Sequence, residues 1–290
     1  MSIIAIVVLY KPEGRKYVDN LRNLSLQVDE VCVVDNSSCS NEDDLRDVPH
    51  LIYFPQYENI GIAAAQNIGL RYAIENNFDY ILFSDPDSSI PPNAVEKLMS
   101  TQKRLSDRAY DVGAVGSTAY SETTGLPYHI KDCLVGKIPE QGVTEVTYTM
   151  NSISLIKVEL FKKVGLMDES LFIDGVDDEW CWRASSQLGK RFFIVDNVII
   201  KHNLGRSKGR IGKRNISIAS PKRLYYEYRN YIWLKRRKYV PKHWVKYNGL
   251  KYIVKFFYYP LFVPPRFDNL VNIIKGIKDG LLIKNNSAKY

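Results

Sequence analysis

The sequence predicts an α/β protein built on an open, mostly parallel sheet that helices cover. Short apolar runs alternate with amphipathic segments along the N-terminal part of the chain, which is typical of repeated strand–helix units. The first run, Ile3–Leu9, is unbroken, as expected for a strand buried on both faces. Polar motifs follow several of the runs, at the strand ends where such sheets bind their ligands.

The individual elements follow in order along the chain. After the strand Ile3–Leu9, a helix is predicted over Arg15–Gln27 because Val18, Leu21 and Leu24 have helical spacing. Further strands are predicted at Val31–Val34, Leu51–Phe54, Tyr80–Phe83 and Val112–Val115. Further helices are predicted at Ala63–Glu75 and at Pro92–Leu105, the latter with proline in its first turn.

Composition excludes several classes of protein. The chain has 290 residues, of which 45% are hydrophobic, which suits a packed domain and excludes a disordered protein. The longest stretch without Asp, Glu, Lys or Arg is Asn59–Leu70, whereas a membrane span needs ~20 apolar residues. The first ten residues lack a basic leader and a cleavage site, so we expect a strand there and no signal peptide. The four cysteines lack metal-ligand spacing and indicate reduced thiols in a cytoplasmic protein.

The net charge of +8 is divided very unevenly. From Lys201 to Tyr290 there are 22 Lys and Arg residues against Glu227, Asp268 and Asp279, a net charge of +19, while the first 200 residues carry −11. We therefore predict a body over residues 1–220 and a basic, aromatic-rich helical extension over 221–290. Such a tail favours an anionic partner: a membrane surface, a nucleic acid or a phosphorylated ligand.

Two carboxylates end the fourth predicted strand. Neither a Gly-x-Gly-x-x-Gly turn nor a P-loop follows the first strand, so any bound phosphate needs a cation or side chains. Asp85-Pro86-Asp87 supplies the oxygen ligands that Mg²⁺ shares with substrate phosphates. The same residues also suit a plain solvated turn.

Two other segments carry candidate site residues. Asn59 and Asn67 flank a run of small residues that begins a predicted helix; the amides suit recognition of a sugar or base, and the small residues also suit tight packing on the sheet. Further on, Asp174–Arg183 places several acids before an aromatic helix. Some of these acids complement the helix dipole, and Asp177, at the end of the loop, could act as a general base.

The motifs together resemble the family 2 inverting glycosyltransferases with the GT-A fold, particularly the rhamnosyltransferase-like branch. The resembling segments are Val33–Ser37, Glu58–Gly61 through Asn67–Gly69, Asp85–Ser88, Val164–Glu169, Phe172–Trp180 and Lys201-His202. They occur in order over about 200 residues, so the ordered set is specific although each motif alone is weak.

The resemblance implies roles for individual residues. It implies a Mg²⁺ or Mn²⁺ ion held by Asp87 and His202, and a catalytic base at Asp177, with Asp178 and Glu179 as rivals because Val176 replaces the usual preceding acid. The residues expected to bind the nucleotide-sugar donor are Tyr10, Asp35, Asn59, Asn67, Asp85, Arg206 and Arg210. Those expected at the acceptor are Asp168 and Trp180.

The segments that follow the body are basic. Gly205–Arg214 places five basic residues among glycines, which suits a loop that closes over a diphosphate or a solvated basic loop. Thr118–Thr149 corresponds to the region that shapes the acceptor pocket in the family. Helices are predicted in the tail at Lys222–Lys238, Tyr247–Tyr259 and Asp268–Leu282. Their mixture of aromatic and basic residues suits an anionic membrane interface, single-stranded nucleic acid or packing on the body.

We therefore expect a metal-dependent inverting transferase that moves L-rhamnose from dTDP-rhamnose to a lipid-linked surface-polysaccharide precursor. It would act as a peripheral protein at the cytoplasmic face of the membrane. We expect no nucleic-acid partner, and the sequence does not determine the oligomeric state. The nearest alternative is a UDP-sugar such as UDP-galactofuranose. Two alternatives of other classes are a sugar nucleotidyltransferase, which would need a Gly-rich basic loop in place of Tyr10–Gly14, and a nucleic-acid-binding module, which would leave the acidic motifs unexplained.

Overall fold

The computed structural model describes residues 1–121, 135, 140–149, 152–202, 208–211 and 214–283. The chain forms two compact units. The first unit comprises Met1–Glu169 and Val176–His202, and the second comprises Ser170–Gly175 and Asn203–Tyr290. Each unit is described by itself below, and the division into domains at residue 220 stays a prediction.

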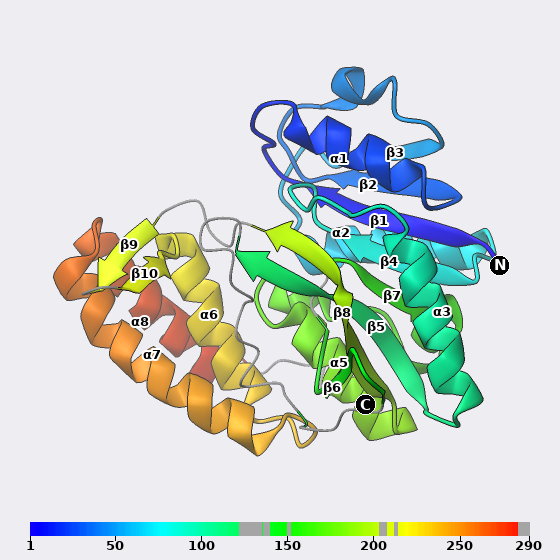
Figure 1. Ribbon diagram of the computed structural model, residues 1–290. Helices are drawn as coiled ribbons and strands as arrows, with labels where there is room; N and C mark the ends of the chain where they lie inside the picture. Colours follow the sequence, from blue (N-terminus) through cyan, green and yellow to red (C-terminus); the bar gives the residue numbers. More distant parts are fainter. Residues whose placement is uncertain (122–134, 136–139, 150–151, 203–207, 212–213, 284–290) are drawn as a thin grey trace. The chain divides into compact units, whose positions relative to one another are not determined.

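The first unit is built on a sheet whose described strands run in the order β3-β2-β1-β4-β7-β5-β8-β6 (Figure 1). Its strands are β1 (Ile3–Leu9), β2 (Glu30–Asp35), β3 (Leu51–Pro55), β4 (Tyr80–Ser84), β5 (Val112–Ser121), β6 (Val143–Val146), β7 (Ser154–Lys157) and β8 (Arg191–His202). Strands β6 and β7 are antiparallel to their neighbours, and the others are parallel. The predicted mostly parallel sheet is confirmed.

Helices cover both faces of this sheet. They are α1 (Lys16–Ser25), α2 (Ile62–Glu75), α3 (Ala94–Asp107), α4 (Val158–Val164) and α5 (Val176–Leu188), with short 3₁₀ turns η1 (Glu42–Leu45) and η2 (Glu169–Leu171). Helices α1 and α3 pack on the face that carries Ala5 and Val7. Helix α2 lies on the other face, where Gly69 approaches Ile6 so closely that a Cβ atom would lie 2.7 Å from its side chain.

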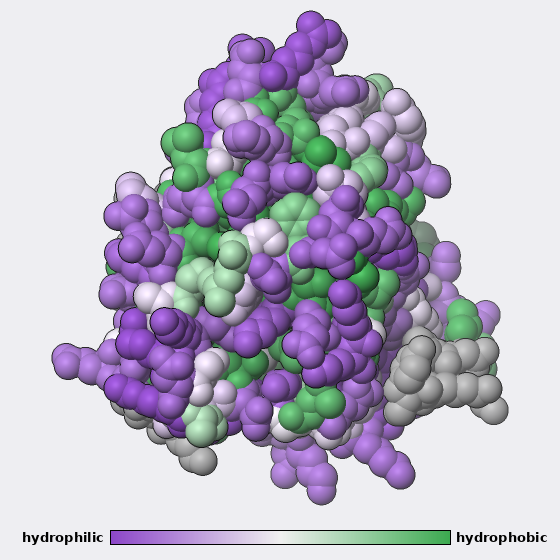
Figure 2. Space-filling view, turned by 90° about the vertical axis from the view of Figure 1, so that its right-hand side faces the viewer, coloured by the Kyte–Doolittle hydropathy of each residue, from purple (hydrophilic) through white to green (hydrophobic). Residues whose placement is uncertain are grey.

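Most predicted elements of the first unit are confirmed, but β5 continues beyond the predicted Val115 to Ser121, and α3 has a different start. Helix α3 begins at Ala94, so Pro92 precedes the helix and does not occupy its first turn. Asn93 at the N-cap has a left-handed φ of 59°, a conformation that Asn adopts more readily than most residues. The face of the molecule on the α3 side of Figure 1 is mostly hydrophilic, with hydrophobic side chains visible between the polar ones (Figure 2).

The second unit consists of a hairpin and three helices. These elements are β9 (Lys208–Ile211), β10 (Arg214–Ser217), α6 (Pro221–Leu234), α7 (Lys242–Phe262) and α8 (Arg266–Leu282). Helix α6 starts with Pro221 at its first position, and the Ser220 hydroxyl accepts a hydrogen bond from the Arg223 N–H; both are standard start signals. Leu224, Tyr259 and Ile273 belong to the core that joins the three helices. The three helices predicted for the tail are confirmed.

Candidate functional site

The carboxyl ends of neighbouring parallel strands bring three predicted site residues to one edge of the sheet. Leu9 of β1 pairs with Asp35 of β2, and Val7 pairs with Ser84 of β4. Tyr10, Asp35 and Asp85 therefore follow three adjacent strands at the same edge. The Tyr10 side chain is 45% exposed. This is the edge at which open α/β sheets bind their ligands.

Asp35 is buried and shapes the loop that follows β2. Its carboxylate accepts hydrogen bonds from the Tyr53 hydroxyl (2.6 Å), from the Asn41 side chain (2.7 Å) and from the Ser37 N–H (2.9 Å). Burial would raise the pKa of Asp35, but these hydrogen bonds outweigh it and lower the pKa below its usual value. The pKa of Tyr53 is raised to about 12 by burial and by its bond to Asp35. Asp35 is therefore a fixed anion at this edge.

Asn36, beside Asp35, was not singled out as a site residue from the sequence. Its side-chain N–H group donates to the Gly61 carbonyl at 3.2 Å, while its buried side-chain oxygen has no hydrogen-bond partner among the residues that the structure describes. A buried acceptor of this kind is costly unless a ligand or water completes it. The Asp35-Asn36-Ser37 motif was the available signal, but only the contacts show which of its atoms stays unsatisfied.

The Asp85-Pro86-Asp87 segment forms a turn at the end of β4. The Ser88 N–H donates to the Asp85 carbonyl at 3.1 Å, and the Asn20 side chain of α1 donates to the Pro86 carbonyl at 3.0 Å. The Asp85 carboxylate is half-buried and accepts a short hydrogen bond from the Ser152 hydroxyl, while Asp87 is exposed. The turn is therefore confirmed. It leaves Asp87 exposed, and the role of Asp85 and Asp87 as ligands stays a prediction.

The segment that holds Asp85 from the other side has unusual backbone geometry. Ile153, directly after Ser152, has a φ of 61° although it is β-branched and fully buried, a conformation that costs free energy. The Ser117 N–H donates to the Ile153 carbonyl at 3.0 Å, and the Ser117 hydroxyl donates to the Ser152 carbonyl at 2.9 Å. Strain held in place by several bonds beside Asp85 supports a functional role for this edge.

The two predicted amides have different surroundings. Asn59 is exposed, and its side-chain oxygen accepts from the Gly61 N–H at 3.0 Å, just before α2. Asn67 is 1% exposed, and its amide is engaged at both ends: it donates to the Met167 carbonyl and to Glu169, and accepts from the Met167 N–H. The amide therefore fastens residues 167–169 to α2. The place of Asn67 in the donor site stays a prediction.

The acids at the start of α5 separate into two groups. Helix α5 begins at Val176, which places the half-buried Asp177 and Asp178 in its first turn. Glu179 is 1% exposed and forms a two-pronged ion pair with Arg183 at 2.9 and 3.0 Å. Because the Glu179 carboxylate is buried and bound to Arg183, it is not available as a base. Asp177 and Asp178 stay as candidates.

Trp180 and Arg183 lie on one face of α5 and bind the same loop. The Trp180 N–H donates to the Gly165 carbonyl at 2.9 Å, and Arg183 donates to the Val164 and Leu166 carbonyls, each at 2.7 Å. Trp180 is 1% exposed and stacks on Phe161. Its surface is used in the core, and the assignment of Trp180 to the acceptor stays a prediction. Asp168, in the same loop, is half-buried.

In the second unit, α6 holds the loop Ser170–Gly175, which leads directly into α5. The Asn230 amide nitrogen lies 2.9, 2.6 and 3.0 Å from the carbonyl oxygens of residues 171, 173 and 174. Arg229 donates to the carbonyls of residues 170 and 171, at 2.7 and 3.0 Å.

Side chains of the loop also contact α6. Arg223 pairs with the Asp174 carboxylate at 2.6 Å, and Phe172 stacks on Tyr226. Phe172 and Asp174 have left-handed φ angles of 64° and 65°, so α6 holds this loop in a defined, strained path.

The remaining predicted residues lie outside the described residues or are described by their backbone alone. Arg206 lies outside the described residues. Arg210 lies in β9 and His202 ends β8 opposite Ser121, and for both only the backbone is described. Most of Thr118–Thr149 also lies outside the described residues. Among the described residues, no group of three or more His, Cys, Asp or Glu side chains forms a ready metal site. The hard oxygen ligands of Asp85 and Asp87 nevertheless fit Mg²⁺ or Mn²⁺.

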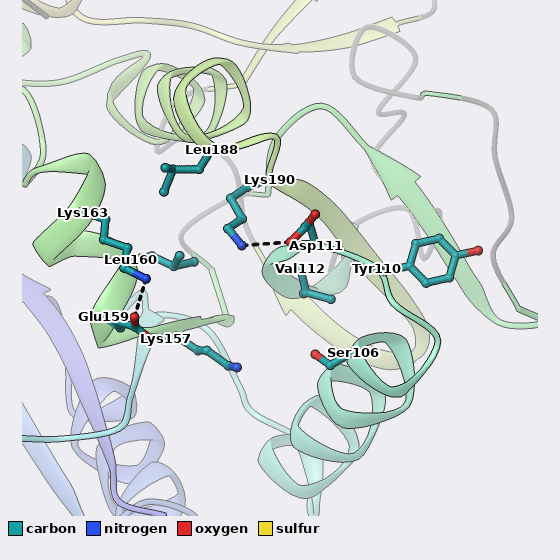
Figure 3. A pocket seen from close by; sticks show the side chains of 10 residues that line it. All are labelled: Ser106, Tyr110, Asp111, Val112, Lys157, Glu159, Leu160, Lys163, Leu188 and Lys190. Atoms are coloured by element: carbon teal, nitrogen blue, oxygen red, sulfur yellow. Dashed lines mark hydrogen bonds and ion pairs between the residues drawn. The ribbon is translucent and has the colours of Figure 1, made fainter.

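A pocket of about 350 Å³ lies away from these residues, where β5 and β8 begin (Figure 3). Three lysines line it, of which Lys163 pairs with Glu159 and Lys190 pairs with Asp111 (Figure 3). Because β5 and β8 run parallel, their starting ends lie at the edge opposite to Asp35 and Asp85. This pocket is therefore separate from the candidate site.

Comparisons of sequence agree with this arrangement. Residues 2–165 match the family model described as Glycosyl transferase family 2. The chain is 34% identical over 248 residues to dTDP-rhamnosyl transferase RfbF of Shigella flexneri, which covers 83% of this chain and 82% of that protein. It is 26% identical over 188 residues to the low-salt glycan biosynthesis hexosyltransferase Agl10 of Haloferax volcanii, which covers 62% of this chain and 60% of that protein.

Solved structures share the fold at low sequence identity. The structure of GalNAc-T7 with UDP, GalNAc and Mn²⁺ has a TM-score of 0.56 and 13% identity, and the alignment covers 97% of this chain and 56% of that one. Residues 1–349 of TarS from S. aureus have a TM-score of 0.51 and 17% identity, with 96% and 91% covered. These likenesses show the GT-A fold, as the sequence predicted.

Proposed function

Because the chain belongs to glycosyl transferase family 2, we propose that it transfers L-rhamnose from dTDP-rhamnose, with inversion, to a hydroxyl of a lipid-linked surface-polysaccharide precursor. The observation that carries the proposal is the 34% identity to a dTDP-rhamnosyl transferase over 83% of the chain. UDP-galactofuranose or another UDP-sugar is the alternative donor. Family membership leaves no reason to assign a sugar nucleotidyltransferase or a nucleic-acid-binding module.

The nucleotide part of the donor is proposed to bind where β1, β2 and β4 end. Tyr10, Asp35, Asn59 and Asp85 are the proposed contacts, with the buried, unsatisfied oxygen of Asn36 as an acceptor for a base N–H group. Asp35 is held as an anion by Tyr53, so it can accept but not donate in this site. Arg206 and Arg210 are proposed to bind the diphosphate, since guanidinium groups suit phosphate oxygens.

A Mg²⁺ or Mn²⁺ ion is proposed to bind Asp87 and His202 next to the diphosphate. When bound, such an ion neutralises the negative charge that develops on the departing nucleoside diphosphate. The exposed Asp87 fits this role better than Asp85, whose carboxylate accepts the Ser152 hydroxyl. Asp85 is proposed to orient the donor ribose instead.

The acceptor hydroxyl is proposed to lose its proton to Asp177 as its oxygen attacks the anomeric carbon. Asp177 occupies the first turn of α5, where the helix dipole favours the ionised carboxylate that a base needs. Asp178 is the rival base. Asp168, half-buried in the loop fastened by Asn67, is proposed to contact the acceptor. A lipid-linked acceptor places the protein at the cytoplasmic face of a membrane.

Calorimetric titration with dTDP, UDP and GDP, each with Mn²⁺ and with chelator, tests the donor. We expect Mn²⁺-dependent binding with preference for dTDP, and tighter binding of dTDP-rhamnose than of UDP-galactofuranose. A preference for UDP would retain the fold and the chemistry but replace the sugar. Absence of binding to all three nucleotides by the folded protein would overturn the proposed donor class.

Replacing Asn230 with Ala is expected to lower kcat by about 10- to 100-fold, because a small misplacement of a reacting group has effects of this size. The substitution removes the hydrogen bonds from the Asn230 amide to the loop Ser170–Gly175. This loop leads into α5, which carries Asp177. The KM for the donor should stay within about twofold, since Asn230 is proposed to position the general base Asp177 and not to contact the nucleotide.

Asn248→Ala is the matched control for this substitution. Asn248 is a buried asparagine of the same unit, and its amide binds the Trp244 carbonyl within α7. Thermal unfolding of both variants separates loss of stability from loss of positioning. Equal losses of kcat in the two variants, or a rise in donor KM with unchanged kcat for Asn230→Ala, would contradict the positioning role.

A further inference from the structure

Helix α7 is apolar on two opposite faces. One face carries Trp244, Tyr252 and Tyr259 and packs inside the second unit: Trp244 lies against Tyr231, and Tyr259 belongs to the core of the three helices. A helix that packs on one side only would carry polar residues on its opposite face. In α7 the opposite face is apolar, and none of the described residues covers it.

The uncovered face of α7 is a continuous stripe. Its residues are spaced alternately three and four apart, which places them on one side of a helix. They are Tyr247, Leu250, Val254, Phe257 and Leu261, exposed by 58%, 67%, 57%, 59% and 57%. We call these five residues the α7 stripe. Exposed hydrophobic residues are ordinary when single, whereas a contiguous row of five indicates an interaction surface.

Helix α8 repeats the arrangement. Its buried side, with Ile273 and Gly276, packs on α6, and Gly276 lies directly against the backbone of Tyr225. Its exposed side carries apolar residues at helical spacing, with the exposed Lys278 between the last two: Phe267, Val271, Ile274 and Leu281, exposed by 75%, 44%, 51% and 54%. Two helices of one unit therefore share the same two-sided character.

Basic residues flank the α7 stripe. Lys246 and Lys251 are exposed, and helical geometry places them on either side of the stripe. Helix α7 contains no Asp or Glu. An apolar stripe between lysines is the pattern of a helix that lies in the plane of an anionic membrane surface, with its lysine heads at the lipid phosphates.

We infer that the α7 stripe inserts into the interface of an anionic lipid bilayer, with α8 contributing the second apolar row. The inference rests on the proposed function only where it explains why membrane binding is useful: a lipid-linked acceptor lies in the membrane. The binding itself is independent of glycosyl transfer. Within the part of the chain that the structure describes, every helix is too short or too polar to cross a bilayer.

Charge and side-chain chemistry favour a lipid surface over other occupants. A second copy of the chain seated on the stripe would bring the lysines of two acid-free helices together, which like charges oppose. Single-stranded nucleic acid would need rings for base stacking, whereas three of the five stripe residues, Leu250, Val254 and Leu261, are aliphatic.

Flotation of the full-length protein with vesicles of phosphatidylcholine, with and without phosphatidylglycerol, tests the inference. We expect binding only to the vesicles that contain phosphatidylglycerol. The variant Leu250→Ser/Phe257→Ser should bind them at least about tenfold more weakly, because it removes two inserting side chains. The variant Lys246→Gln/Lys251→Gln should lose roughly fivefold in affinity for each lysine, and the loss should shrink in high salt.

Leu26→Ser is the matched control, since Leu26 is 79% exposed but lies in the first unit; it should bind vesicles like the unchanged protein. Titration with dTDP, done without vesicles, shows whether each variant is folded and whether the proposed donor class holds. Equal vesicle binding by Leu250→Ser/Phe257→Ser and Leu26→Ser would overturn the inference. A dimer in sedimentation analysis that Leu250→Ser/Phe257→Ser abolishes would overturn it in favour of a second copy. Displacement of the vesicles by a single-stranded oligonucleotide would overturn it in favour of nucleic acid.

Discussion

Asp177→Asn is expected to lower kcat by about 10²- to 10⁴-fold, the range that a general base contributes, while donor affinity changes little. The amide keeps the shape of the side chain in the first turn of α5 but cannot accept the acceptor's proton. Because only the transfer step needs the base, kcat and kcat/KM for the acceptor should fall together. Transfer rates and calorimetric donor binding, measured on the same preparation, check both halves of the expectation.

Asp178→Asn is the matched comparison, because the two carboxylates are neighbours and both are half-buried. We expect this variant to keep most of its activity. An active Asp177→Asn together with an inactive Asp178→Asn would move the base by one residue and leave the rest of the proposal standing. Loss of donor binding in Asp177→Asn would contradict the assignment of Asp177 to the transfer step alone.

Asp87→Ala is expected to remove the effect of Mn²⁺ on donor binding and to weaken binding in Mn²⁺ by at least about 100-fold, since the ion contributes several kcal/mol. Binding in chelator should be almost unchanged, because the remaining contacts to the nucleotide do not involve the ion. Titration of dTDP with and without Mn²⁺ measures both values.

Asp111→Ala removes the same charge at the opposite edge of the sheet, where Asp111 pairs with Lys190. Its donor affinity and Mn²⁺ dependence should match those of the unchanged protein. If Asp87→Ala responds to Mn²⁺ as the unchanged protein does, the metal assignment fails, whatever the affinity for the nucleotide.

The sequence predicts the fold well where the signal is local. Ile3–Leu9 and Tyr80–Phe83 are apolar runs that indicate buried strands. The order of strands and helices then places Asp35 and Asp85 at one edge of the sheet without any knowledge of contacts. Strand β7 has only four residues and lies between strands distant in sequence, so no local pattern predicts it. Such pairing depends on tertiary packing.

Two of the predicted site residues have long-range or buried partners that the sequence does not reveal. Asn67 binds residues 100 positions away, and nothing near it in the sequence indicates that its amide is already occupied. Glu179 differs, because Arg183 four residues later is a helical pairing signal. The sequence alone does not distinguish a buried pair from an exposed one, and burial is what excludes Glu179 as a base.

The loop Ser170–Gly175 groups with the second unit, although both of its flanking segments belong to the first. A chimera that exchanges only the C-terminal helices between relatives would therefore pair a foreign α6 with the native loop, and the loop carbonyls that Asn230 binds here would face the foreign helix instead. Recombination at residue 203 has to carry residues 170–175 along with it. The smallest exchangeable part of this enzyme is thus discontinuous in sequence. Substitutions in residues 170–175 and in the chain after residue 203 are expected to occur together in relatives, although about 30 residues, those of α5 and β8 with their connection, separate the two segments.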